Sequence, residues 1–239
     1  MGRLQIGLCL VALLLSETSD AAANGAWLIP DAMSNTTRLH ICFSDNVQAA
    51  LLDKMETMRV WRLMEQRKVE FVDVTRNESS ICLDAITDDA GTTYGLTHDF
   101  GISSDAGGEK RVFLHAKAHT SADPSTWKSV RDAKRLPLEI VSLREGLKHA
   151  FVVLSDGRPL AEAVVCVNGP DAITLSAKTD DQGRVVFEFP QSGLYGVWTE
   201  LVDPRSGELG GKGYMETRHR STLTLPIEVI PIKKITVAK

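Results

Sequence analysis

FVVLSDGRPLAEAVVCVNGPDAITLSAKTDDQGRVVFEFPQSGLYGVWTEL (Phe151–Leu201) is the stretch that decides the fold. Turn sequences interrupt it at Ser155–Pro159, Asn168–Pro170 and Thr179–Gly183. In such turns proline fixes φ, glycine tolerates positive φ and aspartate bonds to backbone amides. The intervening runs are short and β-branched, and Phe187 and Phe189 fall on one face of a strand. Turns spaced about 8–12 residues apart between such runs predict an all-β sandwich.

Three segments of this stretch resemble the carboxypeptidase-regulatory-like, transthyretin-like sandwich modules. They are DGRPLAEAVV (156–165), TDDQGRVVFEFP (179–190) and SGLYGVW (192–198). The resemblance implies a β-sandwich. It implies no particular function, because one fold carries many functions.

The N-terminal segment 1–23 has the pattern of a cleaved signal peptide. Arg3 supplies the positive region, Ile6–Leu15 the apolar run, and Ala21–Ala23 the small residues at the cleavage site. We therefore expect an exported protein of the periplasm or cell envelope. No other stretch is long and apolar enough for a transmembrane helix, so none is expected in the mature chain.

The rest of the chain predicts a mainly β protein with two β-sandwich-like domains. The first is expected at 24–118, with one short helix at Val47–Met55, and the second at 137–226. A linker or long loop at 119–136 is expected to separate them. A further loop is expected at Asp203–Lys212, and the tail 227–239 has no assignable role.

Length and charge limit the classes of partner. The chain has 239 residues and a formal net charge of −4. An acidic balance does not suit nucleic acid or an anionic membrane surface, so neither is expected as a partner.

Histidines are the candidates for a metal site. His115 and His119 are four residues apart in HAKAH, which on a strand puts them on one face but about 13 Å apart. One ion cannot bridge that distance, so a site would have to draw on other strands. The candidate ligands are His98, His115, His119 and His219. The alternative is that these imidazoles are scattered.

Other chemistry is weakly represented. The sequence has no G-x-S-x-G elbow and no cysteine in a polar, activating context, so no enzyme activity is predicted. Three cysteines remain after cleavage, Cys42, Cys82 and Cys166, so at most one internal disulfide can form. Each lies in an apolar, strand-like run, which favours buried free thiols, and a Cys42–Cys82 bridge is the alternative if their strands are neighbours. The tryptophans could form a sugar-stacking platform, although Trp61 and Trp198 lie in strands and suit a core. The other two are Trp27 and Trp127.

Read end to end, the chain resembles an exported bacterial family of unknown function, some members of which are described as periplasmic nickel-uptake components. The similar segments include WLIPD, LLDKMETMRVWR, TTYGLTHDFG, FLHAKA, LPLEIVSL and METRHRSTLTL. Many relatives carry a histidine just before the N-terminal tryptophan, where this chain has Asn24–Ala26. The resemblance implies a non-enzymatic envelope protein that assists divalent-metal uptake, with an envelope or transporter protein as partner.

Two hypotheses therefore stand. A metal carrier requires two or more of the candidate histidines to converge in the folded protein. A structural or interaction module for a protein or carbohydrate requires instead an exposed aromatic or apolar patch.

Overall fold

The structure is a computed structural model that describes residues 25–30, 38–43, 58–64, 68–76, 81–84, 92–105, 107–129, 136–146 and 148–229. Within these ranges the chain is mainly β, as predicted. The helical segments there are two single 3₁₀ turns, η4 (Pro124–Thr126) and η5 (Pro170–Ala172). The signal peptide 1–23, the helix expected at 47–55 and most of the tail 227–239 lie outside the described residues.

A sheet of eight strands forms the centre of the described structure, in the order β13-β12-β15-β18-β8-β7-β3-β4. All neighbours are antiparallel except β18 and β8, which run parallel. The strands are β3 (Arg59–Leu63), β4 (Val69–Phe71), β7 (Thr93–Asp105), β8 (Gly108–His119), β12 (Val164–Asn168), β13 (Thr174–Lys178), β15 (Gly193–Asp203) and β18 (Glu216–Ile227). The β8–β18 pairing makes one continuous sheet out of strands from both predicted domains, 24–118 and 137–226.

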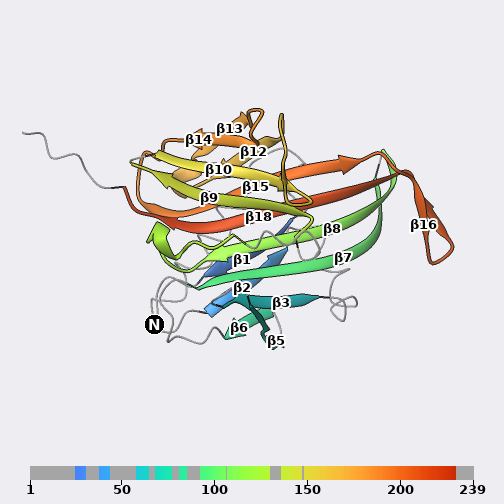
Figure 1. Cartoon of the computed structure of the whole chain (residues 1–239). Helices are drawn as coiled ribbons and strands as arrows, with labels where there is room; N and C mark the ends of the chain where they lie inside the picture. The colour runs from blue at the N-terminus through green and yellow to red at the C-terminus, as the bar shows by residue number, and fades with distance from the viewer. Residues whose placement is uncertain are drawn as a thin grey trace, which may run out of the picture.

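Two smaller sheets lie on either side of this sheet (Figure 1). The N-terminal sheet has the order β1-β2-β6-β5, and in the third sheet β10 pairs with β9, β11 and β14. The N-terminal strands are β1 (Ala26–Pro30), β2 (Arg38–Phe43), β5 (Val74–Arg76) and β6 (Ile81–Asp84). The third sheet contains β9 (Leu138–Glu145), β10 (Lys148–Ser155), β11 (Arg158–Pro159) and β14 (Arg184–Phe187).

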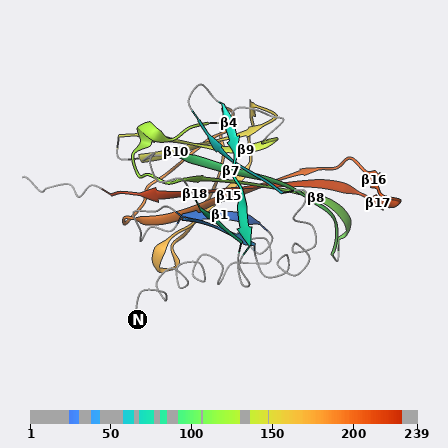
Figure 2. The ribbon, with the colours of Figure 1, turned by 90° about the horizontal axis from the view of Figure 1, so that it is seen from below.

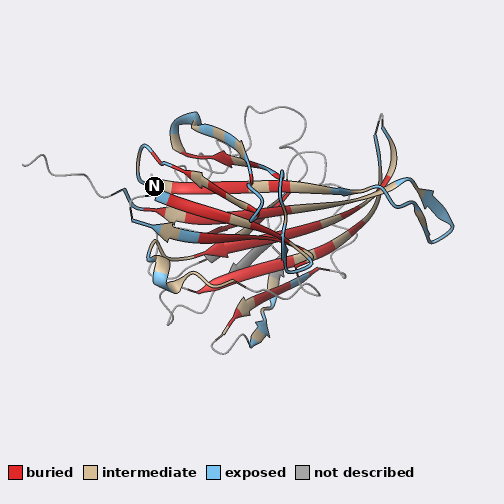
Figure 3. Ribbon diagram, turned by 45° about the horizontal axis from the view of Figure 1, so that its top comes forward, coloured by how far each residue is buried: buried red, intermediate tan, exposed pale blue. Residues whose placement is uncertain are grey.

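Side-chain alternation on the central strands gives each of its two faces a core of its own (Figure 3). On β8 the even-numbered residues Val112, Leu114 and Ala116 pack with Leu28 and Leu39 of the N-terminal sheet. A second core fills the space toward the third sheet, where it includes Phe151, Val165, Tyr195, Leu223 and Leu225. Buried residues therefore run along the middle strands, and the exposed ones lie mainly at the ends of the hairpins.

The turn chemistry predicted for Thr179–Gly183 is present. Asp180 Oδ1 accepts hydrogen bonds from the backbone amides of Gln182 and Arg184, at 2.9 Å each. Gly183 has φ +69°, and a Cβ there would lie 2.8 Å from the backbone atoms Leu160 N and Val153 O. This turn leads into β14, and Phe187 and Phe189 both reach the second core.

The prediction of a loop at Asp203–Lys212 is wrong in part. The chain forms a two-stranded ribbon there, β16 (Gly207–Leu209) and β17 (Lys212–Tyr214), which extends away from the sheets (Figures 1 and 2). Gly210 and Gly211 join the two strands with φ of +59° and +83°. Two consecutive residues of positive φ are what the tightest hairpin turns require, so glycines here connect strands.

The predicted linker or long loop, 119–136, begins with the last residue of β8, and the chain leaves the sheet after that residue. Residues 120–129 contain η4 and no strand. Trp127 packs against the second core, and its indole Nε1 donates to the carbonyl of Ser121 at 2.8 Å. The described part of this range is therefore a long loop anchored to the body of the protein.

Candidate functional site

Two of the four predicted histidines, His115 and His119, lie on one face of β8, and His219 of β18 lies beside them. The odd-numbered residues of β8 include His115, Lys117 and His119, and they face the third sheet while the even-numbered ones face the N-terminal core. These three polar side chains are almost completely buried. The space between the central and third sheets therefore holds a row of polar groups beside its apolar core.

His115 and His219 come together from strands far apart in the sequence. The Nε2 atom of His115 lies 3.2 Å from the Nδ1 atom of His219. The ring planes differ by 8° and the ring centres are 5.5 Å apart. Each nitrogen lies one ring radius from the centre of its own ring. Because the distance between the ring centres exceeds the nitrogen–nitrogen distance by about two radii, both nitrogens lie on the line that joins the centres. This is the geometry of an in-line N–H···N hydrogen bond, with one ring donating and the other accepting.

Both imidazoles of this pair are neutral near pH 7. Burial lowers the pKa of His115 to about 3, and the neighbouring His219 contributes to the shift. Burial also lowers the pKa of His219, against the opposing charges of Asp156 and Asp203. A neutral imidazole is the form that binds metal ions.

His119 is held by hydroxyl groups instead. Its Nδ1 lies 2.9 Å from Thr93 Oγ1, and its Nε2 lies 2.9 Å from Ser142 Oγ. Its ring stacks on Trp127, with centres 5.6 Å apart and planes 11° apart. Burial holds its pKa well below the usual value, with a smaller effect from Lys117. Both nitrogens are occupied, so His119 does not join the His115–His219 pair.

His98 faces the other side of the sheet. On β7 it is the partner of Leu114, which belongs to the core under the N-terminal sheet. His98 and His115 are therefore on opposite faces. The structure brings together two of the four candidate histidines, and its described part holds no cluster of three or more His, Cys, Asp or Glu able to bind a metal ion.

A buried ion pair, not expected from the sequence, lies in the same polar row. Lys117 Nζ is 2.7 Å from Glu139 Oε1, and Ser129 Oγ lies 3.2 Å from the same oxygen. The sequence does contain a pattern that marks this polar row. Odd-numbered positions of one strand carry polar or charged side chains: Arg111, His115, Lys117 and His119. Such a row normally predicts a solvated face. In this structure the third sheet covers the side chains of His115, Lys117 and His119, and for that reason they are buried.

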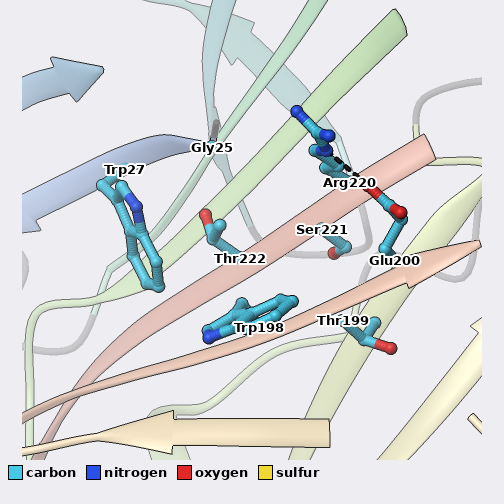
Figure 4. A pocket seen from close by; sticks show the side chains of 8 residues that line it. All are labelled: Gly25, Trp27, Trp198, Thr199, Glu200, Arg220, Ser221 and Thr222. Atoms are coloured by element: carbon cyan, nitrogen blue, oxygen red, sulfur yellow. Dashed lines mark hydrogen bonds and ion pairs between the residues drawn. The ribbon is translucent and has the colours of Figure 1, made fainter. Parts of the chain in front are cut away.

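The second candidate site is a small, shallow and partly open depression between β1 and the central sheet. Trp27 of β1 and Trp198 of β15 line two of its sides, with Thr222 between them, and Gly25 also lines it (Figure 4). Trp27 is 3% exposed, and its indole Nε1 has no hydrogen-bond partner. A Cβ on Gly25 would lie 3.4 Å from that nitrogen, so the N–H edge lies beside the pocket lining.

Charged groups close the pocket at one side. Arg220 Nε donates to Glu200 Oε2 (Figure 4). Arg218 donates to the other oxygen of Glu200 at 3.2 Å. Arg218 also donates to Glu216 at 2.7 Å. Thr222 Oγ1 donates to the carbonyl of Ala26 at 2.6 Å, which ties β18 to β1.

The other two tryptophans are elsewhere. Trp61 is 1% exposed and covers Gly95, where a Cβ would lie 2.0 Å from its ring. Trp127 stacks on His119. The hypothesis that the four tryptophans form one platform is therefore wrong, because only two of them, Trp27 and Trp198, line the same pocket.

Two cysteines are described with their side chains. Cys42 and Cys166 are both half-buried, and Cys166 is a free thiol. The strands of Cys42 and Cys82 are neighbours, as a bridge would require, and the side chain of Cys82 lies outside the described part of the structure.

Comparison with known proteins assigns no family. The chain matches no family model and no curated protein sequence. Among solved structures it is similar to a biofilm-associated protein, BSP domain, at 9% identity and a TM-score of 0.22, covering 84% of this chain and 30% of that one. It is also similar to a pullulanase complexed with maltotriose from Anoxybacillus sp. LM18-11, at 14% identity and a TM-score of 0.20, covering 80% and 27%. The chain thus spans under a third of either structure. In the described residues no helix has the length and apolar character to cross a membrane.

Proposed function

We propose that this chain is a non-catalytic exported protein of the bacterial envelope that carries a divalent metal of the nickel type. The observation that supports this proposal is the convergence of His115 and His219, 104 positions apart in the sequence, at 3.2 Å between ring nitrogens. Two nitrogens bound to one tetrahedral ion at about 2.0–2.1 Å are about 3.3 Å apart. The two rings already have that separation.

A metal would take the place of the proton that the rings share. Both rings would have to tilt, because their nitrogens now face each other along one line. Further ligands would come from water or from carboxylates, and Asp156 and Asp203 are near enough to affect the pKa of His219. Two protein nitrogens with exchangeable further ligands suit a cargo that has to be released.

A non-catalytic role is supported by the surroundings of the histidines. Ser142 and His119 make a contact of the kind that activates a serine nucleophile. Ser142 is 5% exposed, however, and Thr93 stands where such sites have a carboxylate. With its pKa held well below the usual value, His119 is a poor general base.

Calorimetry tests the proposal. Nickel, cobalt, zinc and copper are titrated near pH 7 into residues 24–239. We expect one ion per chain for at least one metal, and loss of that binding in both His115→Ala and His219→Ala. His40→Gln, in the N-terminal sheet, is the control and should bind as the wild type does. No heat, or heat unaffected by either substitution, rejects the carrier function.

The alternative is an interaction module for a protein or carbohydrate partner. The observation that favours it is the pocket between Trp27 and Trp198, which contains none of the candidate histidines.

A further inference from the structure

We infer that Asp203 is a positioning residue of the His115–His219 pair and acts through the outer nitrogen of His219. Its carboxylate favours the ring proton of His219 on Nε2, so that Nδ1 presents a lone pair to His115 or to a bound metal ion. The effect on metal binding rests on the proposed carrier function, whereas the position of the ring protons does not.

The buried end of the pair decides which ring donates. Nε2 of His115 lies 3.2 Å from Nδ1 of His219. The other nitrogen of His115, Nδ1, is buried and has no hydrogen-bond partner within the described structure. A proton on that Nδ1 would be a buried N–H without an acceptor, which is costly and rare, whereas a bare nitrogen only leaves a lone pair unused. His115 therefore carries its proton on Nε2 and donates it to His219.

The outer nitrogen of His219 then carries the second proton, because a neutral imidazole has one donor and one acceptor nitrogen. Strand register shows what lies on that side. On β8, His115 is level with Ser221, two residues beyond His219. On β15, Asp203 is level with Thr217, two residues before His219 and on the same face of the sheet. Such diagonal neighbours are about 7–8 Å apart. Since the two nitrogens of an imidazole point away from each other, the Nε2 of His219 is directed toward the side of Asp203.

The charges around the pair follow the same order. Burial lowers the pKa of His219, and Asp156 and Asp203 oppose that shift. Burial also lowers the pKa of His115, to about 3, and the charge that adds to this effect is that of His219. Acidic groups therefore lie at the outer end of the pair, in the order carboxylate, His219, His115.

Arg205 fixes the carboxylate of Asp203. Its Nε lies 2.9 Å and 2.8 Å from the two carboxylate oxygens, and its backbone amide donates to Oδ1 at 3.1 Å. The hydrogen bonds from Arg205 lower the pKa of Asp203 to about 2, so the carboxylate is ionised near pH 7. The charge of Arg205 itself lowers the pKa of His219. The two members of one ion pair thus act on His219 with opposite signs.

This order of groups matters for a metal ion. A metal-bound histidine usually donates its other ring N–H to a carboxylate, which fixes the tautomer and makes the ring a stronger ligand. His219 is ready to bind through Nδ1, with Asp203 on its far side. His115 has to move its proton from Nε2 to Nδ1, where the N–H has no acceptor. His219 is therefore the stronger ligand of the two, and Asp203 strengthens it further.

Nitrogen-15 NMR of the histidine rings in metal-free residues 24–239 at pH 7.5 tests where the protons lie. We expect the Nε2–H tautomer for both rings, assigned with His115→Gln and His219→Gln. Asp203→Asn should move the two nitrogen resonances of His219 toward each other, because the other tautomer becomes populated. Arg205→Gln breaks the same ion pair but keeps the carboxylate, so it should not. A wild-type His219 protonated on Nδ1, or the same change in both variants, overturns the inference.

Calorimetry with nickel, cobalt, zinc and copper ions tests the effect on binding. Asp203→Asn should weaken binding at least about tenfold, the lower end of what loss of such a carboxylate produces. Arg205→Gln should not weaken it, because a cation near His219 is removed. Asp171→Asn, in η5 beside the other end of β15, is the matched control and should bind as the wild type does.

The outcomes separate the two proposals. Binding unchanged in Asp203→Asn, or weakened equally in Asp203→Asn and Arg205→Gln, overturns the role of Asp203 and leaves the carrier function standing. If the wild type binds no ion, the carrier function fails, and the NMR spectra alone then decide whether Asp203 controls the protons of the pair. Circular dichroism confirms that each variant is folded.

Discussion

Lys117 Nζ lies 2.7 Å from Glu139 Oε1, and each side chain is at most 3% exposed. The two residues belong to different predicted domains and to different sheets, β8 and β9. Their pairing fixes the central sheet against the third sheet near the C-terminal end of β8, where every residue of the strand is buried. Removing two charges from water is costly, so each depends on the other for its place in the interior.

Removal of one partner should therefore destabilise the fold strongly. Lys117→Met removes the buried ammonium group that lies 2.7 Å from Glu139 and keeps the carboxylate in the interior, and we expect a loss of about 3–5 kcal/mol in the free energy of unfolding. The double variant Lys117→Met/Glu139→Leu should recover much of that loss, because no charge is then buried. Urea denaturation followed by circular dichroism measures both.

The chain provides a matched control for this prediction. Lys178 and Glu162 form an ion pair of similar length, 2.9 Å, with side chains 61% and 74% exposed. Lys178→Met should change stability by about 1 kcal/mol or less, since solvent screens an exposed pair. Equal effects of Lys117→Met and Lys178→Met would show that burial does not set the strength of the pair.

Stability should fall as the solution becomes acidic. The pKa of His115 is about 3 in the folded protein and close to 6.5 when unfolded. Below pH 6.5 the unfolded chain takes up a proton that the folded one excludes, so acid favours unfolding down to about pH 3. At pH 5 His115 alone should account for about 2 kcal/mol. His119 adds in the same direction.

Denaturation curves at pH 7.5, 6 and 5 measure this effect. The carboxylate of Asp203, with a pKa of about 2, contributes to the pH dependence only at lower pH. His115→Gln should flatten the dependence on pH without removing it, since His119 remains. Stability that stays constant from pH 7.5 to pH 5 would contradict the burial of neutral histidines.

Local features of the fold were predictable because their causes are local. The turn at Asp180 and Gly183 depends on residues a few positions apart, and both do what the sequence indicates. The alternation of Phe187 and Phe189 likewise places both in the core. A short window of sequence contains everything that these features need.

Long-range pairings have no such local signal. β8 and β18 are parallel neighbours although about a hundred residues separate them, and nothing in RVFLHAKA or TRHRSTLTL specifies that partner. The His115–His219 contact follows from this pairing, and the Lys117–Glu139 contact follows from the cover given by β9. Sequence reasoning selected the right residue types but could not tell which of them would meet. The same limit applies to the Trp27–Trp198 pocket, whose walls come from two sheets.

Two glycines with similar φ separate the cost of backbone conformation from the cost of a clash. Gly183 and Gly157 have φ of +69° and +74°, but a Cβ on Gly157 would meet nothing within 4 Å. Gly157→Ala should therefore cost only about 1–2 kcal/mol, the penalty of the left-handed region. Gly183→Ala adds an overlap with the backbone atoms Leu160 N and Val153 O, which cannot move aside as a flexible side chain can. It should cost clearly more and lower the melting temperature further. Equal melting temperatures for the two variants would mean that the turn before β14 packs more loosely against β10 and β11 than the structure shows.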